Sequence, residues 1–509
     1  MGAPDGVPRQ MLVVNGQFPG PLIEANTGDT IVINVYNALS NGTSLHWHGM
    51  FQNGTNWMDG AASVTQCPIP PGSNFTYEFV VANQYGTYWY HSHASSQYID
   101  GIVGPLIIHN LNDPNKALYD REIVVMISDW YHDFSQDLLV QFLSAEGIQD
   151  TPGTEPVPDN GLFNGLNVYA CSADPSRIDC TGGSINSFSM EPNMRYRLRL
   201  INTGAFADFM FSVDNHTLQV IEADGISITP AAVHRLPIHV AQRYSVILTT
   251  NQTPDAYYMR AIMNQNCFNY DNPALNPETL AILRYSSVSI STVPGASSVD
   301  WGDEIQTPVC LDLNSSMLVP SVAINPPAST QTQTIVISFG TYGPGGIYNR
   351  GFMNYNSWIP LVGTSSLALA HSNISALQTT GQNLLTFEDT TVVDLVLNNV
   401  DEGTHPFHLH GHLFYVLAEG EGRFVGTIPT NPINPLRRDT ISVQSYGHTV
   451  VRVVFDNPGL WMFHCHIQWH MSAGLSMQIV SNPTKIAAFN IPSQLTNFCS
   501  NQAGTLLVA

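Results

Sequence analysis

A cysteine enclosed by two histidines constrains this chain more than any other stretch of its sequence. His464, Cys465 and His466 follow one another, and His470 stands five residues after the cysteine. Imidazole and thiolate together suit copper, zinc and iron, and a set of two imidazoles and one thiolate is the ligand pattern of a blue electron-transfer copper. Successive side chains of an extended strand point to opposite faces. The stretch therefore predicts a strand that binds one copper through Cys465 and presents its two neighbouring histidines to further metals on the other face.

Three more histidine clusters occur earlier in the chain. In each His-x-His pair both rings lie on the same face of a strand, so that they can bind metal from one side. Pro406 keeps His405 extended, and His405 differs in strand parity from His408 and His410, so it can serve a different metal. The clusters are His46-Trp47-His48-Gly49, Tyr90-His91-Ser92-His93 and the run from His405 to His412.

A single cluster of this kind is as compatible with a structural histidine pair as with metal binding. Four clusters, one of them with an embedded cysteine, favour metal binding by ten histidines and Cys465. The other eight histidines are isolated or off-pattern, and we interpret them as structural or surface groups, with His412 lying beside a ligand rather than being one. They are His109, His132, His216, His234, His239, His371, His412 and His448.

The length and composition indicate a globular protein with several β-rich domains. A chain of 509 residues is expected to form roughly two to four domains. The hydrophobic fraction of 43% allows buried cores, while 39 Gly, 33 Pro and only 11% charged residues are typical of a loop-rich β protein. A formal charge of −22 argues against nucleic acids and anionic membranes as partners. We find no apolar run of about 18 residues that would predict a transmembrane helix.

Short apolar runs separated by turn residues recur three times along the chain, after Gln10, after Arg121 and after Thr332. This pattern predicts an all-β protein made of β-sandwiches in series. Linker-like stretches at 111–114 and 286–298 place the boundaries near 112 and 287, which gives domains 1–111, 112–287 and 288–509. The best helix candidate is a short segment around 134–146.

Sequons and cysteines indicate a secreted protein. Seven Asn-x-Ser/Thr sequons are present, at Asn41, Asn53, Asn74, Asn215, Asn251, Asn314 and Asn373, which together favour glycosylation over chance. If Cys465 binds metal, six cysteines remain, an even number suited to disulfides in an oxidising compartment. Their pairing is open from sequence alone, with the short loop from Cys171 to Cys180 as the first candidate. No signal peptide precedes this sequence, and we expect it to have been removed.

The four clusters and their surroundings resemble those of multicopper oxidases, and fungal laccases in particular. The similarity covers essentially the whole chain, including Phe51–Gly60, Gln66–Ile69, Gly86–His91 and Gln97–Gly101. It implies three cupredoxin-like β-sandwich domains, with a type 1 copper in the third and a trinuclear cluster between the first and third. The implied ligands are His405, Cys465 and His470 for type 1 copper, His46 and His408 for type 2, and His48, His91, His466 and His93, His410, His464 for the two type 3 coppers.

The same resemblance implies the chemistry. Aromatic donors give single electrons at the type 1 site, Cys465 passes them to His464 and His466, and the cluster reduces O₂ to water. The axial position of type 1 copper falls on Leu475, which cannot ligate, so a medium or high potential is expected. Asp59 resembles the family's acid beside the cluster, although it could instead cap the loop before Gly60.

Further residues concern protons, substrate and disulfides. Asp439 is a weaker candidate for the proton route. The carboxylate that accepts a phenol proton in many laccases is replaced by Phe206; Asp208 could substitute for it or be a solvated loop residue, and this puts efficient oxidation of simple phenols in doubt. The cysteines resemble ascomycete-type enzymes, which implies the pairs Cys171–Cys180 and Cys267–Cys310, and Cys67 with Cys499.

The leading interpretation is a secreted, monomeric, laccase-like oxidase of phenols and aromatic amines. Its alternatives are a pigment or secondary-metabolite oxidase that couples bulkier phenols, for which Phe206 would be suited, and a ferroxidase or ascorbate oxidase. A copper-binding protein without turnover is the alternative from another class. The complete set of eleven ligands argues against copper storage, since storage needs neither two kinds of site nor the bridging position of Cys465.

Overall fold

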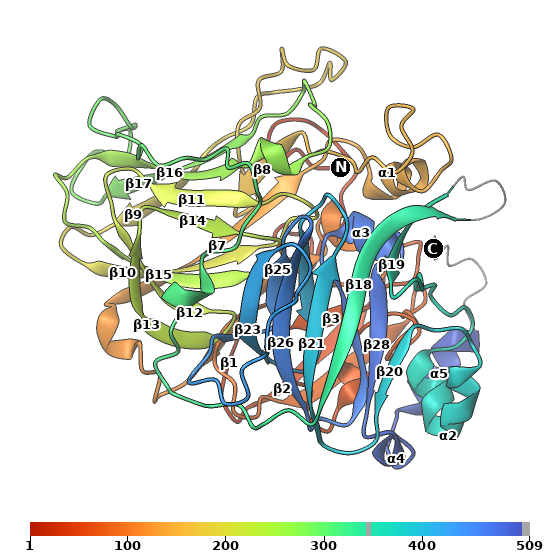
Figure 1. Ribbon diagram of the computed structural model, residues 1–509. Helices are drawn as coiled ribbons and strands as arrows, with labels where there is room; N and C mark the ends of the chain where they lie inside the picture. Colours follow the sequence, from red (N-terminus) through yellow and green to blue (C-terminus); the bar gives the residue numbers. More distant parts are fainter. Residues whose placement is uncertain (343–347, 501–509) are drawn as a thin grey trace.

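Three β-sandwiches in series make up the protein (Figure 1). The computed structural model describes residues 1–342 and 348–500. Each sandwich consists of two sheets, and strands far outnumber helices, so the predicted all-β class with three cupredoxin-like domains is confirmed. Alternation of apolar and polar residues explains the half-buried outer strands, whereas central strands such as β5 and β27 are buried along their whole length because both of their faces are covered.

The first sandwich packs the four-stranded sheet β1-β6-β5-β3 with the two-stranded sheet β2-β4. Along β4 every second side chain is buried, and the inward-facing Tyr77 and Phe79 contact Trp47 of β3. This apolar layer fixes the strand that carries His46 and His48. The strands are β1 Ile23–Asn26, β2 Thr30–Tyr36, β3 Leu45–His48, β4 Asn74–Val80, β5 Gly86–Ser92 and β6 Val103–His109.

The second sandwich has a six-stranded sheet, β13-β12-β15-β10-β7-β8, and a five-stranded sheet, β14-β11-β16-β17-β9. Leu200 of β10 and Val246 of β15 are fully buried between them. The strands are β7 Arg121–Trp130, β8 Asn160–Phe163, β9 Asn186–Met190, β10 Arg195–Asn202, β11 Phe209–Val213, β12 Leu218–Ala223, β13 Ile226–Val233, β14 Arg235–Ile238, β15 Arg243–Thr249, β16 Ala256–Met263 and β17 Glu278–Tyr285.

The third sandwich packs the sheet β19-β18-β21-β26-β23-β24 with the sheet β20-β28-β27-β22-β25. All seven residues of β27 are buried. The strands are β18 Gln331–Tyr342, β19 Tyr348–Met353, β20 Leu384–Phe387, β21 Thr391–Asn399, β22 His405–Leu409, β23 Phe414–Glu421, β24 Arg437–Arg438, β25 Thr440–Val443, β26 Gly447–Phe455, β27 Gly459–Cys465 and β28 Ser476–Ser481.

The described helices are short, and one of them, α3 Gln468–Ser472, is buried for most of its length. The helix expected around 134–146 is present as α1 Ser135–Phe142. The longest helix, α2 Ser366–Gln378, is interrupted at Asn373, whose φ of −164° is not helical. In the described ranges, no helix combines the length and apolarity needed to cross a membrane. The others are α4 Pro483–Ile486, α5 Ser493–Ser500 and the 3₁₀ turns η1 Asn56–Met58, η2 Gln97–Asp100, η3 Lys116–Leu118, η4 Gln265–Cys267 and η5 Ser315–Met317.

Three disulfides match the pairs implied by the resemblance: Cys67–Cys499, Cys171–Cys180 and Cys267–Cys310. The first joins the N-terminal sandwich to α5 near the end of the chain. Among the described residues, Cys465 is the one cysteine outside a disulfide, and it is buried. Its thiol is thus available to a metal, which is what its position between two histidines predicts.

Candidate metal centre

On one face of β27 the sulfur of Cys465 meets two histidine rings. Cys465 Sγ lies 3.5 Å from Nδ1 of His470 and 3.8 Å from Nδ1 of His405. These two nitrogens are 3.0 Å apart. His405 begins β22, the strand paired with β27, and the short helix α3 turns His470 back toward the sulfur. The structure thus gathers three buried soft and borderline donors at one point.

Two carboxylates orient these rings from outside. His470 donates from Nε2 to Glu155 at 2.9 Å, and His405 donates from Nε2 to Asp401 at 3.1 Å. Each of these bonds fixes the tautomer in which Nδ1, facing the sulfur, keeps its lone pair. Burial raises the pKa of Cys465, but His470 and His405 outweigh it and lower the pKa to about 7. The thiolate form that binds metal is therefore accessible near neutral pH.

Leu475 lies against the same group without offering a donor atom. Its side chain is fully buried, its N–H donates to the carbonyl of His470, and its carbonyl accepts from the N–H of Cys465. The strand pairing that positions Cys465 therefore also holds a leucine beside it. The prediction that Leu475 occupies the axial position remains a prediction.

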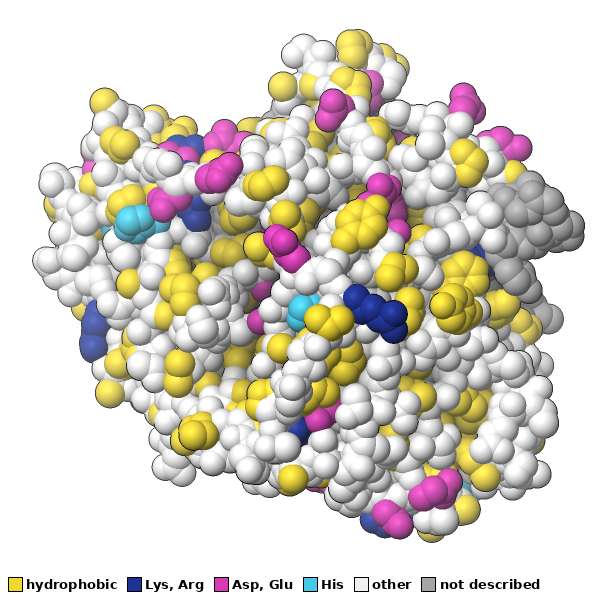
Figure 2. Space-filling model, viewed as in Figure 1, with side chains coloured by type: hydrophobic (Ala, Val, Ile, Leu, Met, Phe, Trp, Pro, Cys, Tyr) yellow, Lys and Arg dark blue, Asp and Glu magenta, His cyan; other side chains and the backbone are white. Residues whose placement is uncertain are grey.

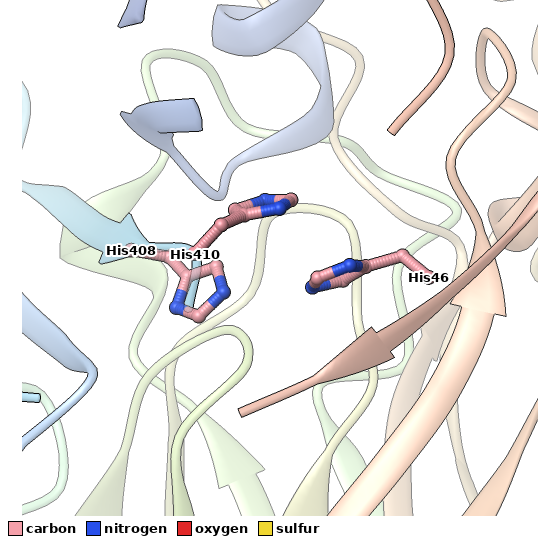
Figure 3. A group of neighbouring side chains, drawn as sticks. All are labelled: His46, His408 and His410. Atoms are coloured by element: carbon pink, nitrogen blue, oxygen red, sulfur yellow. The ribbon is translucent and has the colours of Figure 1, made fainter. Parts of the chain in front are cut away.

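Eight histidines gather on the other face of β27. Strand pairing brings them together: His464 is opposite His408 across β27 and β22, and His46 is opposite His91 across β3 and β5. In Figure 3, His46 reaches from β3 toward His408 and His410, which come from the C-terminal part of the chain. The eight residues are His46, His48, His91, His93, His408, His410, His464 and His466, all of them buried.

Hydrogen bonds aim these rings at one another. His46, His91, His408 and His464 place Nδ1 2.8–3.0 Å from backbone carbonyls, so that each donates from Nδ1 and keeps Nε2 as an acceptor. Several inward nitrogens have no hydrogen-bond partner at all, although they are buried. They are Nε2 of His46, His91, His93 and His408, Nδ1 of His48, and both nitrogens of His466.

The electrostatics of this cluster fit a bound metal. Burial, reinforced by neighbouring imidazoles, lowers the pKa of His464 to about 3 and lowers the pKa of His408. The pKa values of five others fall well below the ordinary value for the same causes. Neutral rings with unpaired buried nitrogens are costly unless a ligand satisfies them. These five are His48, His91, His93, His410 and His466.

The ligand groups expected from the sequence are close in space. Donor atoms of His93, His410 and His464 converge within metal-binding reach, as do those of His46 and His408 together with His410. The rings of His48, His91 and His466 have centroids 5.0–6.0 Å apart. Which ion each group would hold is an assignment that stays a prediction.

Asp59 lies against the cluster. It is fully buried, its Oδ2 accepts from Nδ1 of His410 at 2.9 Å, and its backbone carbonyl accepts from His46 at 2.8 Å. Asp59 follows η1 and precedes Gly60, whose φ of +81° and contact with the Leu45 carbonyl admit no side chain. The carboxylate is thus held at a tight turn against two histidines.

Asp439 is anchored by a residue of the middle domain. Its two carboxylate oxygens each accept from Arg243 at 2.6 Å, and Oδ1 lies 3.3 Å from Nε2 of His48. Although burial raises the pKa of Asp439, Arg243 outweighs it and holds the pKa well below its usual range. A carboxylate held ionised in this way orients neighbouring groups more readily than it carries protons. The proton role of Asp439 stays a prediction.

Comparisons with known proteins agree with this geometry. Three multicopper oxidase family models match residues 2–113, 121–288 and 353–485. The chain belongs to the multicopper oxidase family. It is 36% identical to Laccase-1 of Cryptococcus neoformans var. grubii, over 98% of this chain and 82% of that protein.

Solved structures place the oxidase close to fungal enzymes. It superposes on the crystal structure of a laccase from Botrytis aclada with a TM-score of 0.85 at 35% identity, over 96% of this chain and 87% of that one. It superposes on Fet3p, a multicopper oxidase that functions in iron import, with a TM-score of 0.84 at 30% identity, covering 98% and 92%. The protein is therefore a copper-binding, laccase-like oxidoreductase that uses a small-molecule donor and O₂, and the alternative of a copper-binding protein without turnover is wrong.

The oxidase has a cavity of about 960 Å³ beside His470. Residues of the middle and third domains line it, among them Phe206, Phe268, Phe339 and Glu155. Glu155 and Asp401 were not identified from the sequence. Asp401 precedes His405 by four residues and could have been noticed, whereas nothing in the sequence links Glu155 to a histidine 315 residues away.

Phe206 and Asp208 differ sharply in position. Phe206 lines the cavity, as its predicted place at the missing carboxylate implies. Asp208 is only 3% exposed, so the alternative of a solvated loop residue is wrong. It is not among the lining residues; its carboxylate lies 3.8 Å from His239, and burial raises its pKa. Its role as a proton acceptor stays a prediction, and Glu155 lies closer to the proposed electron entry at His470.

Proposed function

We propose that this oxidase takes single electrons from aromatic donors in the cavity beside His470 and delivers them to O₂ at the histidine cluster. One observation carries the proposal. Cys465 turns its sulfur toward His470, while its neighbours His464 and His466 reach into the cluster. An electron arriving at the sulfur has a path of a few covalent bonds to either ring. The bond from His464 Nδ1 to the Cys465 carbonyl, at 2.9 Å, offers a second path.

We propose four coppers for the eleven ligands. Copper would supply one-electron transfer at Cys465 and, at the cluster, the electrons that O₂ reduction requires. The unpaired ring nitrogens support this set. The assignment is type 1 to His405, Cys465 and His470, type 2 to His46 and His408, one type 3 to His48, His91 and His466, and the other type 3 to His93, His410 and His464.

Protons are proposed to pass through Asp59. Its Oδ2 accepts from His410, while its Oδ1 is buried and has no hydrogen-bond partner, so that a proton can be held at Oδ1 beside the cluster. The alternative, a carboxylate that only shapes the turn before Gly60, rests on the same contacts. Asp439 and Asp208 are retained as weaker candidates for proton transfer, at the cluster and near the cavity respectively.

The remaining proposals concern the whole chain. We propose domains at 1–111, 112–287 and 288–509, and a secreted, glycosylated monomer. Three disulfides support an oxidising compartment. Six of the seven sequon asparagines are exposed, as glycan attachment requires, and Asn215 is half-buried.

Oxidation of ferrous iron is a second candidate function, because a specific contact favours it. Glu155 and Asp401 line the cavity and each accepts from the outer nitrogen of a ring beside Cys465. Carboxylates are suitable ligands for a small divalent cation, and each one would connect it to an imidazole by a single hydrogen bond. The similarity to Fet3p is in line with this candidate.

Oxygen consumption with a panel of donors tests both functions. We expect turnover with a non-phenolic one-electron donor and with an aromatic amine. Turnover with a simple dimethoxyphenol should be slower, because Phe206 stands where many laccases have the carboxylate that accepts the phenol proton. Ferrous iron and ascorbate complete the panel. Turnover with ferrous iron and with no aromatic donor would favour oxidation of ferrous iron over oxidation of aromatic donors. A copper-loaded protein that consumes no O₂ with any donor would contradict both.

Substituting the axial leucine tests the type 1 assignment. Leu475→Met should lower the reduction potential of the blue centre, because a thioether is a weak donor that stabilises the oxidised ion. The potential is measured by redox titration of the blue absorbance. Leu385→Met, which adds the same thioether at a position outside the ligand groups, is the control. An unchanged or raised potential in Leu475→Met would refute the axial position of this residue.

A further inference from the structure

The cavity beside His470 has charge of one sign only. Four of the residues that line the cavity are acidic, namely Glu155, Asp401, Glu402 and Glu421. None of the lining residues is Lys or Arg. Residues 343–347 and 501–509, which the structure does not describe, include no Lys or Arg in the sequence. On the face of the molecule that Figure 2 draws, blue Lys and Arg side chains are scattered and magenta carboxylates are more widespread. Such a cavity attracts cations and repels anions.

The four carboxylates differ in what they already contact. Glu155 and Asp401 are bonded to His470 and His405, so their charge partly serves to orient those rings. Glu402 and Glu421 are exposed, and neither forms an ion pair with any described residue. Arg423, which follows the lining residue Gly422, is not itself part of the cavity wall. The charge of the two outer glutamates is therefore available to a molecule entering the cavity.

The inner wall of the same cavity is aromatic. Phe339 lies 4.8 Å and Phe206 6.3 Å from the ring of His470, measured between centroids, and Phe268 lies 5.3 Å from Phe206. A flat ring can pack against these side chains close to the imidazole. An aromatic floor below an acidic rim matches one kind of molecule, an aromatic ring that carries a cationic group.

We propose that this oxidase selects aromatic donors with a positive charge, and that Glu402 and Glu421 are the residues that determine this preference. The inference rests on the proposed function and narrows its substrate class. The ring of a phenolic donor loses one electron and its hydroxyl proton, the cationic group is unchanged, and four such donors supply the four electrons and four protons that convert one O₂ to two waters. The rim acts on binding and approach and takes no part in the transfer.

Three donors that share one ring and differ in the charged or neutral group attached to it test the proposal. Each is a 2,6-dimethoxyphenol whose para methylene carries a trimethylammonium, a hydroxyl or a sulfonate group, so the charge of this group does not change with the pH of the assay. The kcat/KM of each is measured by O₂ consumption at low ionic strength. For the native enzyme we expect kcat/KM to be highest for the cationic donor, lower for the neutral one and lowest for the anionic one. The cationic-to-anionic ratio should fall about tenfold in Glu402→Gln/Glu421→Gln, since removing each rim charge changes each rate by a small factor.

Controls separate this effect from the net charge of the protein. Glu78→Gln removes an exposed charge from β4, which contributes nothing to the cavity, and should leave the ratio unchanged. Salt is a second measurement on the native enzyme: the ratio should shrink toward one above about 0.5 M, where screening acts within a few ångströms.

Three results would overturn the proposal. The first is a cationic-to-anionic ratio of kcat/KM of one or below in the native enzyme. The others are a ratio that does not change in the double variant, or a ratio that falls equally in Glu78→Gln. If the neutral phenol is not oxidised at all, and neither is any other aromatic donor, it is the proposed function that fails.

Discussion

Replacing Cys465 with serine will remove the blue absorbance and lower turnover at least about a thousandfold, because residues that act as one unit fail together when one is lost. The sulfur is the only soft donor of its group, and a serine hydroxyl of nearly the same size does not replace a thiolate as a copper ligand. The covalent path from the cavity to His464 and His466 would also lose its starting atom. The measurements are the visible spectrum, the copper content and O₂ consumption.

The copper content of the same variant serves as a control, because Cys465 and the eight clustered histidines lie on opposite faces of β27. The eight histidines of the cluster do not contact the removed sulfur through a donor atom, so copper should be lost only in part and the fold retained. Loss of all copper would mean that Cys465 supports the whole centre structurally. A serine variant that stays blue and active would contradict the assignment of Cys465 as ligand and electron path.

The parity of a strand explains why so much of this centre could be predicted. Cys465 and its two neighbours are fixed by a period of two, which holds wherever the backbone is extended, and β27 is extended through Cys465. The pair His46/His48 lies within β3 and follows the same rule, whereas His410 and His466 each stand one residue beyond the end of their strand, β22 and β27. Among the disulfides, spacing alone favoured only Cys171–Cys180, and the other two pairs were predicted through the resemblance.

Loops and long-range ion pairs could not be predicted in this way. Asp208 was considered because it stands two residues from Phe206, but both lie in the loop before β11, where no period fixes the direction of side chains. Glu155 lies in another loop, and its contact with His470 depends on how two domains meet. Arg243 begins a buried strand, and its sequence gives no sign that its partner is Asp439 of another domain.

Arg243→Gln should cause the largest loss of stability among the substitutions of buried charged residues. The side chain is fully buried and connects all three domains: it donates to both oxygens of Asp439 and, through Nε, to the Thr87 carbonyl at 3.1 Å. Its Nη1 also lies 3.5 Å from Asp224. Removing one partner of a buried ion pair leaves the other charge uncompensated, which costs about 3–5 kcal/mol.

The consequence should extend to the metal centre. Asp439 Oδ1 is 3.3 Å from His48, and the Asp439 carbonyl accepts from His408 at 3.0 Å, so a displaced Asp439 loosens two rings of the cluster. We expect a lower midpoint of chemical unfolding, followed by tryptophan fluorescence, and faster loss of copper to a chelator. The blue absorbance should persist, because Arg243 does not contact the group around Cys465.

A matched arginine shows whether burial is the cause. Arg121 is 56% exposed and pairs with Glu191, which is 53% exposed, at 3.0 Å. An exposed pair of this kind contributes about 0–1 kcal/mol, so Arg121→Gln should change neither the unfolding midpoint nor copper retention appreciably. If Arg243→Gln behaves like Arg121→Gln, Asp439 has another source of compensation, and Arg243 is not what orients the rings of the cluster. If it fails as expected, the domain that contributes no donor to the metal groups nevertheless orients two of their rings, through the single carboxylate that Arg243 holds.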